Sequence, residues 1–194
     1  MVQKILFIII GSVCGFILGS CMFSYWLGRL IGKDIRKYGD GNPGAINAFK
    51  AGGYKIGIPA MILDFLKGFL PIFIIYHYNA IQDFTIIFIA VALLLGHIFP
   101  VFLDFKGGKS IAPSFGIWAG FTLWKVPVSA GIIMAFLKLG LKVKNDALIT
   151  LIGFAGSFIM FIFFSNALPL IIVAILNLIA LIYTHRNDLL RSVK

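Results

Sequence analysis

The sequence predicts an all-α, polytopic membrane protein with about seven transmembrane helices. Of its 194 residues, 60% are hydrophobic and only 12% are charged, and the mean hydropathy is +1.02. Such values lie far from those of a soluble domain. The chain has no alternation of apolar and polar residues typical of a membrane barrel, so helices are the expected spanning elements. We expect residues 1–194 to form a single transmembrane helical domain.

Seven apolar segments have roughly the length that a membrane-spanning helix requires. They cover about residues 4–27, 55–77, 84–103, 110–124, 126–141, 147–164 and 167–184. The fourth and fifth are short and weakly separated, so they are either two short helices or one broken element that does not fully cross. In the first segment, Gly11, Gly15 and Gly19 recur every four residues, which predicts a close contact with another helix.

The distribution of positive charge predicts the orientation of the chain. Lys and Arg number 17 against seven acidic residues, for a net charge of +10. If the N-terminus lies outside, 14 of these cations fall on the inner side, whereas the outer side holds only Lys4 and Lys125. Positive residues concentrate in cytoplasmic loops, so we expect N-out/C-in. On a membrane protein this charge indicates anionic headgroups as partners, not nucleic acid.

A polar loop at residues 34–47, DIRKYGDGNPGAIN, follows the first apolar segment. Its three glycines allow backbone N–H groups to turn inward and form an anion-binding nest. Arg36 and Lys37 bring positive charge to the same place. The loop therefore predicts a site that holds a phosphate at the bilayer surface.

Two ionisable residues, Asp64 and Lys67, lie inside the second apolar segment. They are three residues apart, so they share a helix face and can pair. Ionisable groups inside a membrane are costly and indicate a functional site by default. The alternative is an internal salt bridge that orders a nearby loop, and both interpretations remain open at this point.

A third cluster runs from Gly96-His97 to the turn Lys106-Gly107-Gly108-Lys109. Two ammonium groups and the flexible backbone amides of the glycines suit a phosphate. The alternative is that the lysines only set the topology and contact lipid headgroups.

The sequence contains no zinc pattern, no P-loop and no serine-histidine-acid set. We therefore expect no metal and no cofactor. The remaining chemistry is electrostatic: the protein would hold phosphates, stabilise developing charge and position an acceptor.

Together the three clusters resemble the motifs of the bacterial integral-membrane acyl-phosphate:glycerol-3-phosphate acyltransferases. Residues 34–50 are similar to D-I-R-x-x-G-S-G-N-x-G-A-T-N-x-x-R, residues 64–68 to D-x-x-K-G, and residues 96–113 to G-H-x-x-P-x-F-x-x-F-K-G-G-K-x-x-A-T. The resemblance implies transfer of a fatty acyl group from acyl phosphate to the 1-position of glycerol 3-phosphate. The products would be lysophosphatidic acid and phosphate, in the first step of phospholipid synthesis.

The resemblance also implies a location and a set of site residues. The protein would be a monomer in the bacterial plasma membrane, with its active site facing the cytoplasm. Catalytic roles would fall to His97, Lys109 and Asn42, and Asp64 with Lys67 would support the site. The expected substrate-binding residues are Arg36, Asp40, Gly41, Gly44, Asn47, Lys50, Lys106, Gly107 and Gly108.

The chain departs from the family motifs within these clusters. Asp40 and Ile46 stand where the family has Ser and Thr, Lys50 where it has Arg, and Pro113 where it has Thr. A hydroxyl can donate to phosphate, whereas an ionised carboxylate only accepts, so Asp40 needs a cation, and Arg36 or Lys37 could supply it. The departures leave a second hypothesis: a catalytically silent or re-specialised paralogue that acts as a membrane binding or regulatory protein, or that uses a different acceptor.

Overall fold

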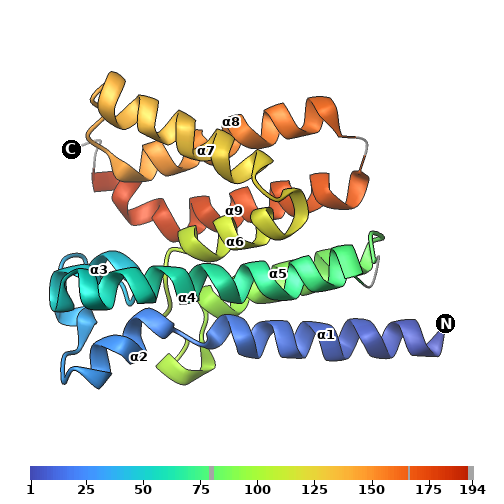
Figure 1. Ribbon diagram of the computed structural model, residues 1–194, viewed down its shortest axis with the longest axis horizontal. Helices are drawn as coiled ribbons and strands as arrows, with labels where there is room; N and C mark the ends of the chain where they lie inside the picture. Colours follow the sequence, from blue (N-terminus) through green and yellow to red (C-terminus); the bar gives the residue numbers. More distant parts are fainter. Residues whose placement is uncertain (79–80, 166, 192–194) are drawn as a thin grey trace.

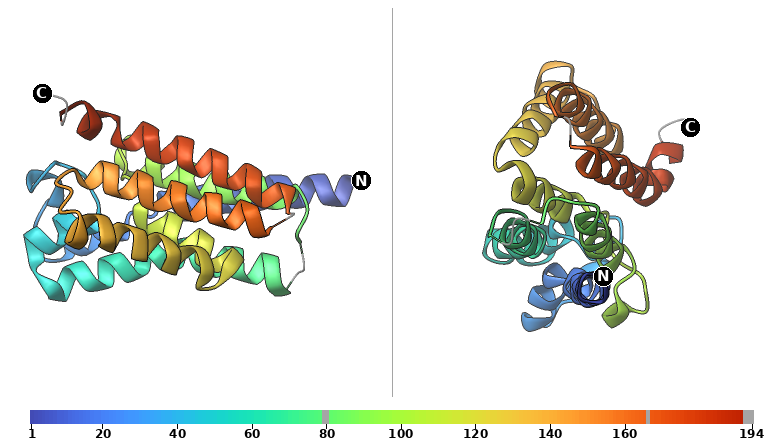
Figure 2. Two further views of the ribbon diagram at one scale, coloured as in Figure 1. Left: turned by 90° about the horizontal axis from the view of Figure 1, so that it is seen from above. Right: turned by 90° about the vertical axis from the view of Figure 1, so that its right-hand side faces the viewer.

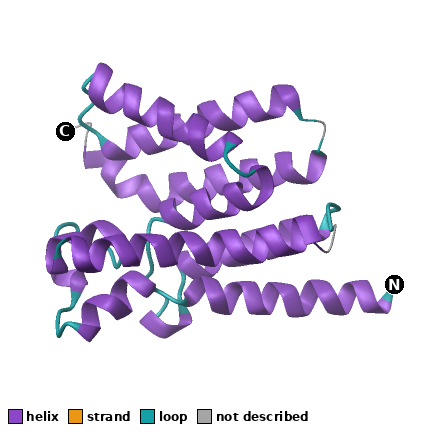
Figure 3. Ribbon diagram, viewed as in Figure 1, coloured by secondary structure: helices purple, strands orange, loops and turns teal. Residues whose placement is uncertain are grey.

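The computed structural model describes residues 1–78, 81–165 and 167–191, and within these ranges it contains helices and loops but no strand (Figure 3). The α-helices are α1 (Val2–Ser20), α2 (Phe23–Leu30), α3 (Ala45–Gly52), α4 (Tyr54–Phe73), α5 (Thr85–Ile98), α6 (Ile111–Thr122), α7 (Lys125–Ala135), α8 (Asp146–Phe164) and α9 (Leu168–Arg191). Short 3-10 helices form at Ile35–Lys37 and Val101–Leu103, and π-helical turns extend α4 and α7 at Ile74–Tyr78 and Phe136–Gly140.

The long helices lie side by side in one elongated bundle, with α1, α4 and α5 in one group and α7, α8 and α9 in another (Figures 1 and 2). The helix α6 lies between the groups and packs on α4. Within the described residues, five stretches are long and apolar enough to cross a membrane: Val2–Leu30, Tyr54–Tyr78, Thr85–Leu103, Asp146–Phe164 and Leu168–Leu190. The prediction of an all-helical membrane protein is confirmed. The start of α1 and the end of α9 lie at opposite ends of the bundle (Figure 1).

The first apolar segment is not the single helix that we expected over residues 4–27, because it breaks between α1 and α2. Lys67 on α4 donates to the carbonyl oxygen of Cys21 at 2.6 Å, and Asp64 accepts from the backbone N–H of Ser24 at 3.3 Å and from its hydroxyl. Helix ends leave backbone groups without partners inside the helix. The buried ion pair on α4 supplies two such partners and so stabilises the break.

The glycine repeat of α1 lies against α5, as the four-residue spacing predicts. A Cβ atom on Gly11 would meet the side chain of Ile89, one on Gly15 its carbonyl oxygen, and one on Gly19 the carbonyl oxygen of Leu93. Small residues allow two helix backbones to approach this closely in a membrane.

The two short segments form separate helices, α6 and α7, which run in opposite directions (Figure 1). A buried polar network joins α6 to α9. The indole N–H of Trp118 donates to Asn177 Oδ1 at 2.9 Å, and Asn177 Nδ2 donates to Ser114 Oγ at 2.8 Å. Buried polar groups require such partners, so this network fixes the middle of α9 against α6.

Candidate functional site

A hollow of about 420 Å³ opens between the two polar loops and the end of α9. We call it the basic pocket. Among the described residues that line it, four side chains carry positive charge and two carry negative charge, so its lining is net positive. The lining residues are Arg36, Asp40, Gly41, Asn42, Pro43, Ile98, Phe99, Phe105, Lys106, Gly107, Gly108, Lys109, Tyr183, Thr184, Arg186, Asn187 and Asp188.

Lys109 lies between two carboxylates of the basic pocket. Its Nζ atom is 2.5 Å from Asp40 Oδ2 and 2.7 Å from Asp188 Oδ2. The sequence suggested Arg36 or Lys37 as the partner of Asp40, and that expectation is wrong for this structure. Arg36 instead bonds Asp34 at 2.7 Å. The carboxylate that departs from the family motif is therefore neutralised by Lys109.

The ion pairs keep both Asp40 and Lys109 charged. Partial burial raises the pKa of Asp40, but hydrogen bonds from Lys109, the Asn42 amide and Asn47 outweigh it and hold that pKa below its usual value. Burial lowers the pKa of Lys109, but its bonds to Asp188 and Asp40 outweigh this effect and raise it. A hydrogen bond to the charged form of a group favours that form. At neutral pH the basic pocket therefore presents the ammonium group of Lys109 paired with the ionised carboxylate of Asp40.

The first polar loop satisfies much of its own hydrogen bonding. The amide N–H of Gly41 donates to the carbonyl oxygen of Tyr38, and the amide N–H of Asn42 donates to Asp40 Oδ1, both at 3.1 Å. The Asn47 side chain, 1% exposed, donates to Asp40 Oδ1 and to the Asn42 carbonyl. These two amides are thus not free to form the anion nest that the glycines suggested.

The Gly107-Gly108 turn folds back onto the end of α5. The amide N–H groups of Gly107 and Gly108 donate to the carbonyl oxygens of Ile98 and His97, at 3.1 and 3.0 Å. A Cβ atom on Gly107 would collide with the His97 carbonyl, and one on Gly108 would collide with the His97 ring. The expectation that these amides are available for a phosphate is therefore wrong. Glycine is needed at position 107 because the backbone of the turn touches the backbone at the end of α5. The side chains of Lys106 and Lys109, on either side of the two glycines, line the basic pocket.

His97 lies behind this turn and not in the lining of the basic pocket. Its side chain is 4% exposed, and its ring is covered by Gly108. Asp64 and Lys67 lie deeper still, where their side chains pair at 2.8 Å. The pairing predicted from their spacing is confirmed. The resemblance implied a catalytic role for His97, but this placement behind the turn and outside the lining favours a role in shaping the site.

Two further predicted residues lie at the edge of the loop. Gly44 precedes α3, and Lys50 is an exposed residue of α3 whose ammonium group lies beside Gly39. Neither lines the basic pocket.

Sequence reasoning missed the end of α9. Thr184, Arg186, Asn187 and Asp188 line the basic pocket, and the Thr184 hydroxyl donates to the Lys109 carbonyl at 3.2 Å. The available signal was the polar run from Thr184 to Asp188 directly after an apolar segment.

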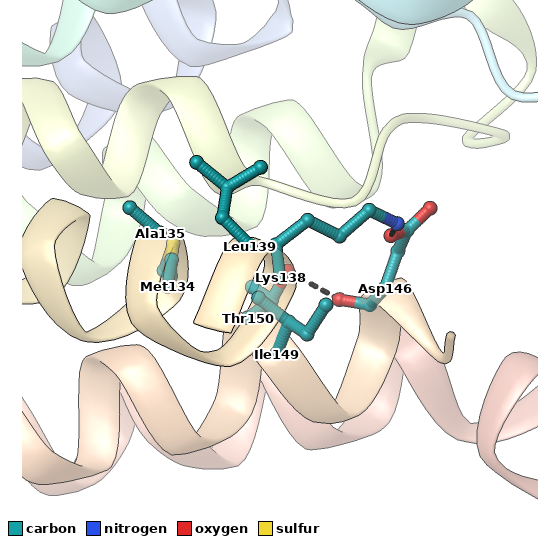
Figure 4. A pocket seen from close by; sticks show the side chains of 7 residues that line it. All are labelled: Met134, Ala135, Lys138, Leu139, Asp146, Ile149 and Thr150. Atoms are coloured by element: carbon teal, nitrogen blue, oxygen red, sulfur yellow. Dashed lines mark hydrogen bonds and ion pairs between the residues drawn. The ribbon is translucent and has the colours of Figure 1, made fainter. Parts of the chain in front are cut away.

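A second hollow, of about 400 Å³, lies between α7 and α8 (Figure 4). Most of its lining is apolar, and its two charged side chains, Lys138 and Asp146, pair with each other at 2.6 Å. It offers no excess charge to an anionic ligand, so the basic pocket is the better candidate site.

An all-helical bundle with a cation-rich pocket at one end defines an integral membrane protein equipped to bind an anionic substrate. The chain belongs to the glycerol-3-phosphate acyltransferase family, whose model matches residues 9–194. It is 37% identical over 191 residues to glycerol-3-phosphate acyltransferase 1 of Thermotoga maritima, covering 92% of this chain and 94% of that protein. It is 38% identical over 148 residues to the Aquifex aeolicus glycerol-3-phosphate acyltransferase, covering 69% of this chain and 76% of that protein.

The fold is also similar to solved structures. A crystal structure of PlsY (YgiH), an integral membrane glycerol 3-phosphate acyltransferase, in its glycerol 3-phosphate form, matches with a TM-score of 0.88 and 29% identity, covering 96% of this chain and 92% of that one. The lysophosphatidic acid form of PlsY matches with a TM-score of 0.87 and 28% identity, covering 96% and 91%.

Proposed function

We propose that this protein transfers a fatty acyl group from acyl phosphate to the 1-position of glycerol 3-phosphate, giving lysophosphatidic acid and phosphate. The observation that carries the proposal is the basic pocket: it gathers Lys106, Lys109 and Arg186 at one end of a membrane bundle, in a chain of this family. Both substrates carry phosphate, and cationic side chains are the groups that bind it. Family relatives bear the name of this activity.

In this proposal, the predicted residues divide into direct contacts and supporting residues. Lys109, Lys106 and Arg36 bind phosphate oxygens, and Asn42 offers its side-chain amide to a substrate. Lys50 adds positive charge at the edge of the loop, which attracts anionic substrates. The supporting residues are His97, which shapes the Gly107-Gly108 turn, Asn47, which fixes the first loop, and the pair Asp64 and Lys67.

Catalysis would rest on positioning and charge. The cations hold the two phosphates together, so that the acceptor hydroxyl meets the acyl carbon. They also stabilise the negative charge that develops on the carbonyl and on the departing phosphate. In this arrangement Asp40 stands where the family motif has serine, and its carboxylate pairs with Lys109.

We propose that all seven elements α1–α2, α4, α5, α6, α7, α8 and α9 cross the bacterial plasma membrane, as one domain and as a monomer. The N-terminus would lie outside and the C-terminus inside, because the basic loops lie on one side of the seven crossings. The basic pocket would then face the cytoplasm. Cysteine labelling from either side of the membrane, at Lys4→Cys and at Lys142→Cys, tests the orientation.

The function is tested with purified protein in lipid, palmitoyl phosphate and radiolabelled glycerol 3-phosphate. We expect labelled lysophosphatidic acid and an equal amount of released phosphate. Phosphate release without labelled lipid would show hydrolysis or a different acceptor. Neither product from a folded sample would contradict the proposal and favour the silent paralogue.

A further inference from the structure

Tyr183 is an aromatic residue in the lining of the basic pocket, on α9, and it is 44% exposed. Arg186, three residues later, lies on the same helix face. The guanidinium carbon Cζ of Arg186 lies over the ring of Tyr183, 4.1 Å from its centre. A cation within about 6 Å of the centre of an aromatic ring, over its face, is attracted to the ring. The Tyr183 ring therefore forms a platform for the guanidinium group of Arg186.

A hydrogen bond fixes the guanidinium group of Arg186 in the same place. Its Nη1 atom donates to the carbonyl oxygen of Tyr183 at 2.5 Å. A guanidinium group is planar and carries five N–H groups along its edge, and this bond uses one of them. The ring of Tyr183 covers a flat face of the guanidinium group and not its edge. The stacked arrangement therefore orients Arg186 without covering the edge that carries its donors.

The platform is itself held by parts of the chain outside α9. Phe99 directly follows α5, where its backbone N–H donates to the carbonyl oxygen of Leu95 at 2.7 Å. The centres of the Phe99 and Tyr183 rings are 5.8 Å apart, with 50° between their planes, a separation at which aromatic rings attract each other. The next residue, Thr184, donates to the Lys109 carbonyl at 3.2 Å. These two contacts place Tyr183 relative to both α5 and the basic pocket.

The other arginine in the lining, Arg36, also lies on a tyrosine ring. Its Cζ atom is 4.8 Å from the centre of the Tyr25 ring, and its Nη2 atom donates to the Tyr25 hydroxyl at 3.3 Å. Arg36 is held in addition by Asp34, which accepts from Nε at 3.0 Å and from Nη2 at 2.7 Å. Each arginine that lines the basic pocket is thus stacked on an aromatic ring before any substrate binds.

We propose that Tyr183 is a positioning residue for a substrate phosphate, which it serves by holding Arg186 in its binding orientation. The inference rests on the function proposed above. A long side chain that is ordered only on binding loses rotamer freedom, and this loss weakens the complex. Arg186 would lose less, because the Tyr183 ring has already ordered it. The planar guanidinium edge can then donate to two phosphate oxygens at once.

The test begins with steady-state kinetics of variants at Tyr183. Tyr183→Leu removes the ring, and we expect the KM for glycerol 3-phosphate, for palmitoyl phosphate or for both to rise about two- to fivefold, with kcat changed little. The substrate whose KM rises is the one whose phosphate Arg186 binds. Tyr183→Phe keeps the ring and should keep the wild-type KM values. Tyr54→Leu is the matched control, because Tyr54 is an exposed tyrosine at the start of α4 and lies outside the lining.

A double-mutant cycle with Arg186→Gln shows whether Tyr183 acts through Arg186. Arg186→Gln alone should raise the same KM, because it removes the cation. Adding Tyr183→Leu to Arg186→Gln should raise it no further, since the ring then has no guanidinium group to hold. Such a departure from additivity is the signature of two residues that act together.

The outcomes separate this inference from the function on which it rests. Wild-type KM values for Tyr183→Leu would overturn the inference, and so would an equal rise in KM for Tyr183→Phe, which would assign the effect to the hydroxyl. Additive effects of Tyr183→Leu and Arg186→Gln would also overturn it, because the ring would then contact a substrate directly. A folded wild type without transfer activity would overturn the proposed function alone. Calorimetric titration of the same variants with glycerol 3-phosphate would then decide the inference.

Discussion

The ammonium group of Lys109 lies 2.5 Å from Oδ2 of Asp40, the carboxylate that stands where the family motif has serine. The pair joins the two polar loops across the basic pocket. The same Asp40 carboxylate also holds Asn47 and the Asn42 amide. Asp40 therefore keeps the first loop ordered, and it occupies the cation that a substrate phosphate would use.

Asp40→Ser should strengthen the binding of glycerol 3-phosphate. Two unit charges 4 Å apart repel by about 4 kcal/mol at an effective dielectric of 20. The Asp40 side chain is 37% exposed, and water screening reduces the repulsion between exposed charges to about 1 kcal/mol. Removing that repulsion should lower the KM for glycerol 3-phosphate roughly fivefold. Steady-state kinetics measure this change. Ile46→Thr is the control, because Ile46 is 66% exposed and outside the lining. A higher KM for Asp40→Ser would show that Asp40 contacts the acceptor.

Lys67→Met should destabilise the bundle strongly, because it leaves the Asp64 carboxylate buried without its cation. Removing one partner of a buried ion pair costs about 3–5 kcal/mol. The double variant Asp64→Leu/Lys67→Met should be more stable than the single variant. Thermal unfolding in detergent compares them. Equal stabilities of Lys67→Met and the wild type would refute the role of this pair in stabilising the break between α1 and α2.

Gly108→Ala should disturb the basic pocket, since its Cβ atom would collide with the ring of His97. Overpacking of this kind costs about 1–3 kcal/mol, and the transfer rate should fall with it. Gly131→Ala is a matched control within α7, where a Cβ atom meets nothing within 4 Å. That change should raise stability by up to about 1 kcal/mol. Unfolding midpoints and acyl-transfer rates are measured for both variants. A Gly108→Ala variant with wild-type stability and activity would contradict the close contact between Gly108 and the His97 ring.

Acid should remove the stabilising effect of Asp34. Hydrogen bonds from Arg36 lower the pKa of Asp34 from 3.8 to about 2. A carboxyl whose pKa is lower in the folded state stabilises that state above its unfolded pKa, and the effect disappears as pH falls through the folded pKa. Asp34→Asn should therefore be less stable than the wild type at pH 6, and the difference should close between pH 3.8 and about 2. A difference that stays constant over this range would show that the ion pair contributes nothing.

The sequence predicted the features that depend on near neighbours. The apolar segments form helices, the glycine repeat of α1 packs closely against α5, and Asp64 pairs with Lys67 three residues away. These outcomes follow from helical periodicity, which is visible in the sequence.

The features that were missed depend on contacts between distant parts of the chain. The break at Cys21 requires a partner on α4, and the Asp188–Lys109 pair joins residues 79 positions apart. The Gly107-Gly108 turn resembled an anion nest, but its amides bond the end of α5. Periodicity and spacing carry no information about which segments meet in space.

The central claim is that acyl transfer takes place in the basic pocket around Lys109. The most direct measurement is the rate of acyl transfer from palmitoyl phosphate to glycerol 3-phosphate by Lys109→Gln and Lys125→Gln. Lys125 is an exposed lysine at the start of α7 and lies outside the lining. Removing a group that stabilises developing negative charge costs about 10²- to 10³-fold, so Lys109→Gln should lose at least that much while Lys125→Gln keeps the wild-type rate. Equal rates for the two variants would contradict the account.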